Sequence, residues 1–300
     1  MRKKTVNPKT GLYAILGDPI SHSMSPVLMN SSFDRLDMDN VFLALKANLE
    51  TFDTVMTAMK HVGMKGYTFT MPVKEVALAH MDELSDEAAI IGAVNCAVNR
   101  DGKLTGYNTD SLGFWAAVQE KNTEKRPIRK AFIMGAGGFG RAAAAQAALQ
   151  GVEEIVVANI MDHTPFIESF RLFMARIAAK CPDVTIRLVD WKPEEWTAEL
   201  ASSQLVVNAT PNGLKDKGDL HEVFPYEAVS PGTIFFDAIY EPRFTRFLKE
   251  ADARGFVTVT GLDLLAHQGV CSFRNWTGAE VDYDTMRRDV LDYWASLEQG

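Results

Sequence analysis

Short apolar runs alternate with segments of helical spacing along the chain, and this alternation predicts a layered α/β protein. In the first half, strands are expected at 11–16, 41–45, 66–70, 95–99 and 104–107, and helices at 25–36, 49–62, 74–80 and 86–91. Asp101-Gly102 separates the last two strands and predicts a two-residue hairpin turn. Ser25 is expected to cap the first helix, with Pro26 at its first helical position.

The second half starts with a polar stretch at 120–129, which suits an exposed connection between domains. A buried strand at 130–134 then runs into a glycine-rich turn, a helix at 141–149 and a second buried strand at 154–158. Further strands are expected at 185–189, 205–208, 233–237 and 257–260, and helices at 166–179, 244–253 and over the last thirty residues. A length of 300 residues agrees with about two domains.

The glycine-rich turn contains Gly135, Gly137 and Gly140 in the pattern G-x-G-x-x-G. The first glycine permits a tight turn, the second lets the backbone approach a pyrophosphate, and the third allows close packing of the helix on the strand. The start of the helix then offers unpaired N–H groups to phosphate. The strand–turn–helix–strand context favours a dinucleotide site over the alternative, a glycine-rich turn that binds nothing.

The end of the second strand of this unit bears on the choice of cofactor. The stretch 158–163 contains no Arg or Lys for the 2′-phosphate of NADP, and Asp162 follows Gly140 by 22 residues, near the spacing of a ribose-binding acid. The alternative is that Asp162 only caps the next helix. We predict NAD as the cofactor, with NADP the less favoured choice.

Composition and charge narrow the classes of partner. The chain has 31 Lys and Arg against 39 Asp and Glu, a formal charge of −8, which disfavours a nucleic-acid surface. Cys96, Cys181 and Cys271 lie far apart, which argues against a disulfide framework and a metal cluster, so we expect no metal. Neither a signal peptide nor a membrane-spanning run is recognisable, and a cytoplasmic location is expected.

Two ionisable residues in the first third are candidates for proton transfer. Lys74 and Asp110 each follow a strand end, and both are expected on loops. A lysine beside a carboxylate can accept the proton of an alcohol while a hydride leaves. Ser23 and Ser25 lie where a helix begins, and their hydroxyls suit a substrate carboxylate. The alternatives are a surface lysine, a turn aspartate and an ordinary helix cap.

Taken together, the segments resemble the shikimate/quinate dehydrogenase family over nearly the full length of the chain. The resemblance rests on 17–26, 70–75, 91–95, 108–110, 135–140, Asn208-Ala-Thr210 with Gly213, Asp237 with Tyr240, and 261–268. It implies a two-domain α/β fold. Residues 1–118 with 268–300 would form an N-terminal α/β substrate domain, and residues 119–267 an inserted Rossmann-type dinucleotide-binding domain.

The resemblance also implies roles for individual residues. Lys74 and Asp110 match the catalytic pair, and Ser23 and Ser25 match the serines that hold the substrate carboxylate. The remaining substrate contacts would come from Thr68, Thr70, Asn95, Tyr240 and Gln268. Cofactor contacts would come from Gly135, Ala136, Gly137, Gly138, Phe139, Gly140, Asn159, Asp162, Asn208, Ala209, Thr210 and Gly261.

The sequence departs from the family pattern in two informative places. Thr68 stands where the family usually has Asn, which leaves the identity of the ring acid open. Ile160 stands where NADP-type members carry Arg, which again favours NAD. We expect reversible oxidation of shikimate to 3-dehydroshikimate. The alternatives are quinate, a related ring hydroxy acid, or a ligand-sensing module without turnover. The partner is a small molecule, not nucleic acid or membrane, and a homodimer stays open.

Overall fold

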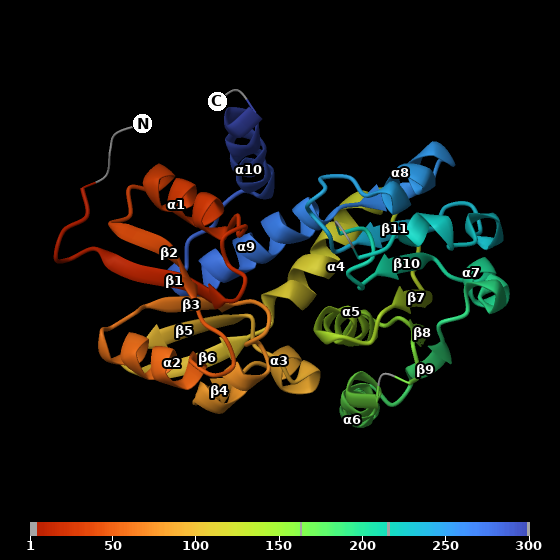
Figure 1. Ribbon diagram of the computed structural model, residues 1–300, viewed down its shortest axis with the longest axis horizontal. Coiled ribbons are helices and arrows are strands. Elements are labelled where there is room, and N and C mark those ends of the chain that lie inside the picture. Colours follow the sequence, from red (N-terminus) through yellow and green to blue (C-terminus); the bar gives the residue numbers. More distant parts are fainter. Residues whose placement is uncertain (1–4, 163, 215–216, 299–300) are drawn as a thin grey trace. The chain divides into compact units, whose positions relative to one another are not determined.

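The computed structural model describes residues 5–162, 164–214 and 217–298, which pack into two compact units (Figure 1). The first unit contains the described residues of Met1–Thr109 and Leu265–Gly300, and the second contains those of Asp110–Leu264. Both divisions fall inside helices, namely α4 (Thr109–Lys121) and α9 (Gly261–Thr277). The borders expected at 118/119 and 267/268 lie nine and three residues further along the same two helices.

The first unit is built on a six-stranded mixed sheet in the order β2-β1-β3-β5-β6-β4. Its strands are β1 (Gly11–Gly17), β2 (Asn40–Lys46), β3 (Gly66–Phe69), β4 (Glu83–Leu84), β5 (Cys96–Arg100) and β6 (Lys103–Tyr107). Its helices are α1 (Ser25–Arg35), α2 (Phe52–His61), α3 (Asp86–Ile91), the second part of α9, and α10 (Tyr283–Glu298). The hairpin of β5 and β6 is confirmed, and Asp101 and Gly102 take the positive φ values of 55° and 86° that its turn requires.

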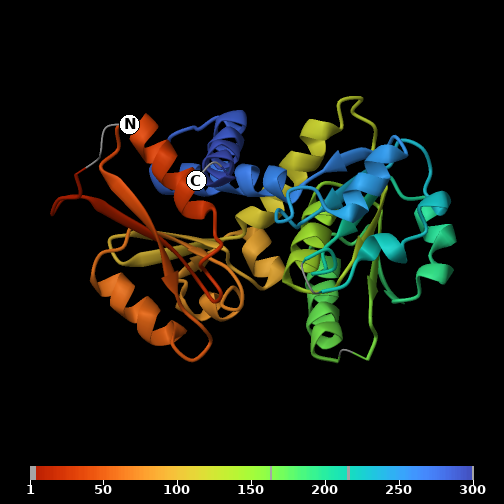
Figure 2. The same ribbon diagram turned by 45° about the horizontal axis from the view of Figure 1, so that its top comes forward.

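Strand β1 is buried on both faces, because helices cover both sides of this sheet (Figures 1 and 2). On one face Ala14 and Leu16 belong to a core that includes Phe52 of α2. On the other face the Tyr13 ring packs on Phe33 of α1 and Trp276 of α9, with ring centroids 5.1 and 5.3 Å apart. The alternation of side chains along one strand therefore joins two separate helical layers.

The second unit has a parallel sheet in the order β12-β11-β10-β7-β8-β9. Its strands are β7 (Lys130–Met134), β8 (Glu154–Asn159), β9 (Thr185–Asp190), β10 (Leu205–Asn208), β11 (Ile234–Asp237) and β12 (Val257–Val259). Its helices include α4, α5 (Gly138–Leu149), α6 (Thr164–Lys180), α7 (Thr197–Ala201) and α8 (Arg246–Ala253). This is the doubly wound order of a Rossmann-type domain, so the predicted two-domain α/β fold is confirmed. The strand order reverses between β7 and β10.

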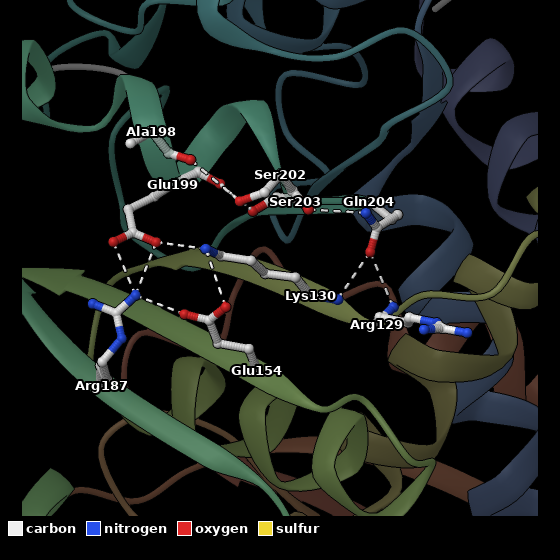
Figure 3. A network of polar contacts seen from close by, with 9 residues as sticks. All are labelled: Arg129, Lys130, Glu154, Arg187, Ala198, Glu199, Ser202, Ser203 and Gln204. Carbon is white, nitrogen blue, oxygen red and sulfur yellow. Dashed lines mark hydrogen bonds and ion pairs between the residues drawn. The ribbon is translucent and has the colours of Figure 1, made fainter.

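A network of ion pairs ties this sheet together at the end where β7 and β8 begin (Figure 3). The Lys130 ammonium lies 2.6 Å from Glu199 of α7 and 3.2 Å from Glu154 of β8. The Arg187 guanidinium of β9 lies 2.6 Å from Glu154 and 2.9 Å from Glu199. Because β7 begins at Lys130 and the glycine-rich turn follows its other end, this network lies away from that turn.

Four local expectations were wrong. Met24 occupies the N-cap position of α1 without a side-chain cap hydrogen bond, and Ser25 is already the first residue of the helix, because Met24 has near-helical dihedrals of φ −86° and ψ −4°. Asp110 lies in the first turn of α4 rather than on a loop. The helix expected at 74–80 is a turn followed by a short 3₁₀ helix at Val76–His80. Helix α5 also begins at Gly138, three residues earlier than expected.

None of the described helices has the length and apolar character needed to cross a membrane. The same part of the chain holds no group of His, Cys, Asp and Glu side chains that is placed to bind a metal ion.

Candidate active site

The topology of the first sheet brings most of the predicted substrate residues to one edge, namely the side of the sheet where strands β1, β3 and β6 end. Strands β1 and β3 are parallel, whereas β5 is antiparallel to β3 and to β6. The carboxyl ends of β1, β3 and β6 therefore coincide with the start of β5. The segments at this edge contain the two serines after β1, Thr70 and Lys74 after β3, Asn95 before β5, and Thr109 after β6.

Backbone contacts hold these segments close together. The Thr70 N–H donates to the Leu16 carbonyl over 2.9 Å, and the Val94 N–H donates to the Lys74 carbonyl over 2.9 Å. A β-carbon added at Gly17 would lie 2.2 Å from the Thr70 side chain, so the glycine lets the segment after β3 close over the end of β1. Lys74, on the turn after β3, is thereby tied to the residue that precedes Asn95.

The two serines lie where the chain enters α1. The Ser23 hydroxyl accepts a hydrogen bond from the Ser25 N–H over 3.3 Å, and Ser25 is buried. Thr68, inside β3, is buried, and its hydroxyl has no hydrogen-bond partner among the described residues. Gln268, on α9, donates to the Leu265 carbonyl of its own helix over 2.9 Å. All four side chains belong to the first unit.

Asn95 is held by a buried hydrogen-bond chain that the sequence did not reveal. The Thr109 N–H donates to Asn95 Oδ1 over 2.6 Å, and Asn95 Nδ2 donates to Thr109 Oγ1 over 3.0 Å. Thr109 Oγ1 also lies 2.9 Å from Ser272 Oγ of α9. Asp110 is the next residue, in the first turn of α4, where the helix dipole favours a negative side chain.

The glycine-rich turn of the second unit follows β7 at the point where the strand order reverses. Gly135 has φ +105°, and a β-carbon there would lie 3.0 Å from the Ala209 carbonyl oxygen after β10. A β-carbon at Gly140 would lie 1.9 Å from the Gly135 carbonyl oxygen, whereas one at Gly137 would meet no atom within 4 Å. Gly135 and Gly140 thus shape the turn, and Gly137 leaves open space beside the N-terminus of α5. This arrangement fits a dinucleotide pyrophosphate.

At the end of β8, the last strand residue supports the turn, and residues that follow it are exposed. Asn159 Oδ1 accepts from the Ala136 N–H over 3.1 Å, and Asn159 Nδ2 donates to the Ile160 carbonyl over 3.0 Å. The Ile160 side chain is 44% exposed, and Asp162 is exposed as well. His163 lies outside the described residues. The described part of 158–163 therefore presents no cation where an adenosine ribose would lie.

Aromatic packing fixes the other side of the turn. The Phe139 ring stacks on Phe236 of β11, with centroids 5.8 Å apart, and meets the Phe114 ring of α4 edge-on at 6.0 Å. Gly138, the neighbouring residue, is exposed, and a β-carbon there would meet no atom within 4 Å. One side of the turn is therefore anchored in the core while Gly137 and Gly138 stay open.

A fully buried carboxylate organises the ends of β10 and β11. Asp237 accepts hydrogen bonds from Asn208 Nδ2 over 3.1 Å, the Ile239 N–H over 3.0 Å and Thr245 Oγ1 over 2.7 Å. Burial raises the pKa of Asp237 to about 6 despite these donors. Asn208 Oδ1 in turn accepts from the Thr210 hydroxyl over 2.7 Å. Asn208 is thus engaged inside the protein, and Asp237, which the sequence indicates only as part of a motif, holds the ends of β10 and β11 in place.

Gly261 and Tyr240 belong to the same edge. A β-carbon at Gly261 would lie 2.4 Å from the carbonyl carbon of Ile239, so only glycine lets α9 begin against this segment. Tyr240 follows directly, and burial raises the pKa of its phenol. The segment that carries Tyr240 is therefore fixed from two sides, by Gly261 and by the Asp237 bond to Ile239.

Known proteins share both units. The family model described as shikimate dehydrogenase substrate binding domain matches residues 15–97, and the one described as shikimate 5′-dehydrogenase C-terminal domain matches residues 261–291. A shikimate dehydrogenase (NADP(+)) from Desulforamulus reducens is 34% identical over 282 residues, which cover 94% of this chain and 95% of that protein.

Two solved structures are similar over almost the whole chain. Shikimate 5-dehydrogenase from Listeria monocytogenes, in complex with shikimate and NAD, has a TM-score of 0.87 at 32% identity, covering 96% of this chain and 98% of that one. Quinate dehydrogenase from Corynebacterium glutamicum, in complex with NAD, has a TM-score of 0.84 at 27% identity, covering 94% and 99%. The chain belongs to the shikimate dehydrogenase family.

Proposed function

We propose that this chain is a shikimate dehydrogenase, which interconverts shikimate and 3-dehydroshikimate with a nicotinamide dinucleotide. The observation that carries the proposal is the glycine-rich turn at the reversal of strand order, with open space at Gly137 where a pyrophosphate is needed. A second edge, in the other unit, gathers hydroxyl, amide and lysine side chains suited to a hydroxylated ring acid. The curated relative at 34% identity carries the same activity in its name.

The residues of this chain divide the work of an alcohol oxidation. The bound dinucleotide supplies the acceptor for the hydride that leaves the carbinol carbon. Lys74 takes the hydroxyl proton in oxidation and returns it in reduction. Asp110 orients the lysine and the same hydroxyl, and Ser23 and Ser25 hold the ring carboxylate. Asn95, Thr70, Gln268 and Tyr240 would hold the ring, and Gly135–Gly140, Asn208–Thr210 and Gly261 would hold the cofactor.

We further propose that NAD is preferred to NADP. An NADP site needs an Arg or Lys against the 2′-phosphate, whereas the segment after β8 presents exposed Ile160 and the negative Asp162. The relative from Desulforamulus reducens is named for NADP(+), and the structure from Listeria monocytogenes contains NAD. The test is Ile160→Arg. It should raise kcat/KM with NADP⁺ relative to NAD⁺ by about tenfold or more, since one good phosphate contact contributes about 1.5–3 kcal/mol.

The second candidate is a dehydrogenase of quinate or of another ring hydroxy acid. Thr68 favours it, because its buried hydroxyl is shorter than the usual amide and lacks a protein partner among the described residues. A ring that carries a further polar group would satisfy this hydroxyl. Relative kcat/KM values for shikimate and quinate separate the two candidates.

Replacing the proton acceptor tests the catalytic assignment. Lys74→Ala should lower kcat by about 10²- to 10⁴-fold, the usual contribution of general acid–base catalysis. The matched control is Lys65→Ala, since Lys65 is exposed and precedes β3 at its other end. Both variants should bind the dinucleotide with the affinity of the unmodified chain. Full activity of Lys74→Ala would refute the assignment, and ligand binding without turnover in the unmodified chain would indicate a sensing module.

A further inference from the structure

The hydrogen-bond chain behind Asn95 joins three residues of the first unit that are distant in sequence. Asn95 precedes β5, Thr109 begins α4, and Ser272 lies in the middle of α9. The three residues are 2%, 0% and 0% exposed, so water does not compete for their polar atoms. Trp276, one turn beyond Ser272, donates its indole N–H to the Ala97 carbonyl of β5 over 3.0 Å and fixes α9 on the sheet.

The donors and acceptors around Asn95 determine how its side-chain amide is oriented. Its Oδ1 accepts the Thr109 N–H at 2.6 Å and lies 3.2 Å from the Thr109 hydroxyl. Its Nδ2 donates one hydrogen to Thr109 Oγ1 over 3.0 Å. A backbone N–H can only donate, so the amide cannot turn over without placing two donors against each other. The orientation of Asn95 is therefore fixed.

The Thr109 hydroxyl has one hydrogen and two lone pairs, and all three are needed in this arrangement. When it donates to Asn95 Oδ1 and accepts from Asn95 Nδ2, its second lone pair is left to accept from Ser272 Oγ at 2.9 Å, a contact in which either hydroxyl could be the donor. With Ser272 as donor, the Thr109 hydrogen is left for Asn95. Without Ser272, one lone pair of a fully buried hydroxyl is unsatisfied, and the rotation of that hydroxyl is no longer determined.

We propose that Ser272 is a positioning residue for substrate recognition, acting through Thr109 to hold the Asn95 amide with one N–H left for the ligand. The inference rests on the proposed function, in which Asn95 contacts the ring. Both lone-pair positions of Asn95 Oδ1 are occupied, and one of the two hydrogens on Nδ2 is taken by Thr109. The substrate atom that Asn95 meets is therefore an acceptor, such as a hydroxyl or carbonyl oxygen, and not a donor such as an ammonium.

The same hydrogen-bond chain also affects the position of Asp110. The Thr109 N–H that bonds to Asn95 belongs to the first residue of α4, and Asp110 is the second. Movement of Thr109 therefore shifts the backbone that carries Asp110. Loss of Ser272 should affect substrate binding first, through Asn95, and turnover second.

The test compares Ser272→Ala with Ser32→Ala. Ser32 is also 0% exposed and on a helix of the same unit, but its hydroxyl donates only to the Leu28 carbonyl of its own helix, over 2.8 Å. Ser272→Ala should raise KM for shikimate about three- to tenfold, the cost of one lost hydrogen bond, with a smaller change in kcat. The dissociation constant of the dinucleotide should not change. Ser32→Ala should leave all three quantities unchanged.

A double-mutant cycle with Asn95→Ala separates positioning from general destabilisation. If Ser272 acts through Asn95, Ser272→Ala should raise KM less than twofold in the Asn95→Ala background. Equal KM values for Ser272→Ala and Ser32→Ala, or full additivity with Asn95→Ala, would overturn the inference while the unmodified chain still oxidises shikimate. An unmodified chain that neither binds nor oxidises shikimate would instead overturn the proposed function.

Discussion

Replacing Gly137 by alanine should separate cofactor binding from folding. The residue precedes α5 with φ −72° and ψ −171°, which is extended backbone open to any L-residue. A β-carbon there would meet no protein atom within 4 Å. The added methyl group therefore strains nothing in the free protein, but it occupies the space in which the backbone approaches the pyrophosphate.

The structure sets the size and sign of both effects. Gly→Ala at an unstrained position commonly stabilises a protein by about 0.4–1 kcal/mol, because the unfolded chain loses freedom. An extra methyl group in a filled contact costs about 1–3 kcal/mol. At about 1.4 kcal/mol per factor of ten, Gly137→Ala should weaken dinucleotide binding about 5- to 150-fold, with an unchanged or higher melting temperature.

Calorimetric titration with NAD⁺ and thermal unfolding of the free protein measure the two effects. Gly140→Ala provides the contrast, because its β-carbon would lie 1.9 Å from the Gly135 carbonyl oxygen. That variant should lose stability and binding together. Unchanged NAD⁺ affinity in Gly137→Ala would refute the placement of the pyrophosphate, and a lower melting temperature would refute the description of the turn as open.

Two further predictions concern charge in the second unit. Burial raises the folded-state pKa of Asp237 from 3.8 to about 6, so its contribution to stability is lost as pH rises through that window. Asp237→Asn should therefore stabilise the protein at pH 7.5 by at most about 3 kcal/mol, and by less at pH 4.5, in thermal unfolding at both pH values. A stabilisation of equal size at pH 7.5 and pH 4.5 would contradict this prediction. Lys130→Met should cost about 1–3 kcal/mol in urea unfolding at pH 7, because it leaves Glu154 and Glu199 with Arg187 alone. Ion pairing holds the pKa of both glutamates below 4.5, so the loss of unfolding free energy caused by Lys130→Met should shrink below pH 4.5. A loss of the same size below pH 4.5 would contradict its assignment to these ion pairs.

Features encoded by neighbouring residues were predictable from the sequence. The turn at Asp101-Gly102 needs positive φ at two adjacent positions, and Asp-Gly is a pair of residue types that adopts such values readily. The glycine-rich turn was equally clear, because each glycine answers a local steric demand. The helix at Asp110 was not, since Thr109 is already its first residue and is held by a long-range hydrogen bond to Ser272.

Contacts between segments distant in sequence could not be predicted from local sequence patterns. Ser272 and Thr109 are 163 residues apart, and the sequence around each residue carries no signal of the contact between them. Asp237 likewise meets Asn208 from a neighbouring strand, 29 residues away. A buried polar network is set by tertiary packing, so its members look like ordinary serines, threonines and aspartates in the sequence.

Initial rates with shikimate and quinate, each with NAD⁺ and NADP⁺, test the central claim most directly. The account predicts turnover of shikimate, with kcat/KM higher for NAD⁺ than for NADP⁺ and higher for shikimate than for quinate. Higher kcat/KM with NADP⁺ would contradict the interpretation of Ile160 and Asp162 and leave the activity intact. No turnover in any of the four combinations, in a chain that still binds NAD⁺, would contradict the proposed reaction itself.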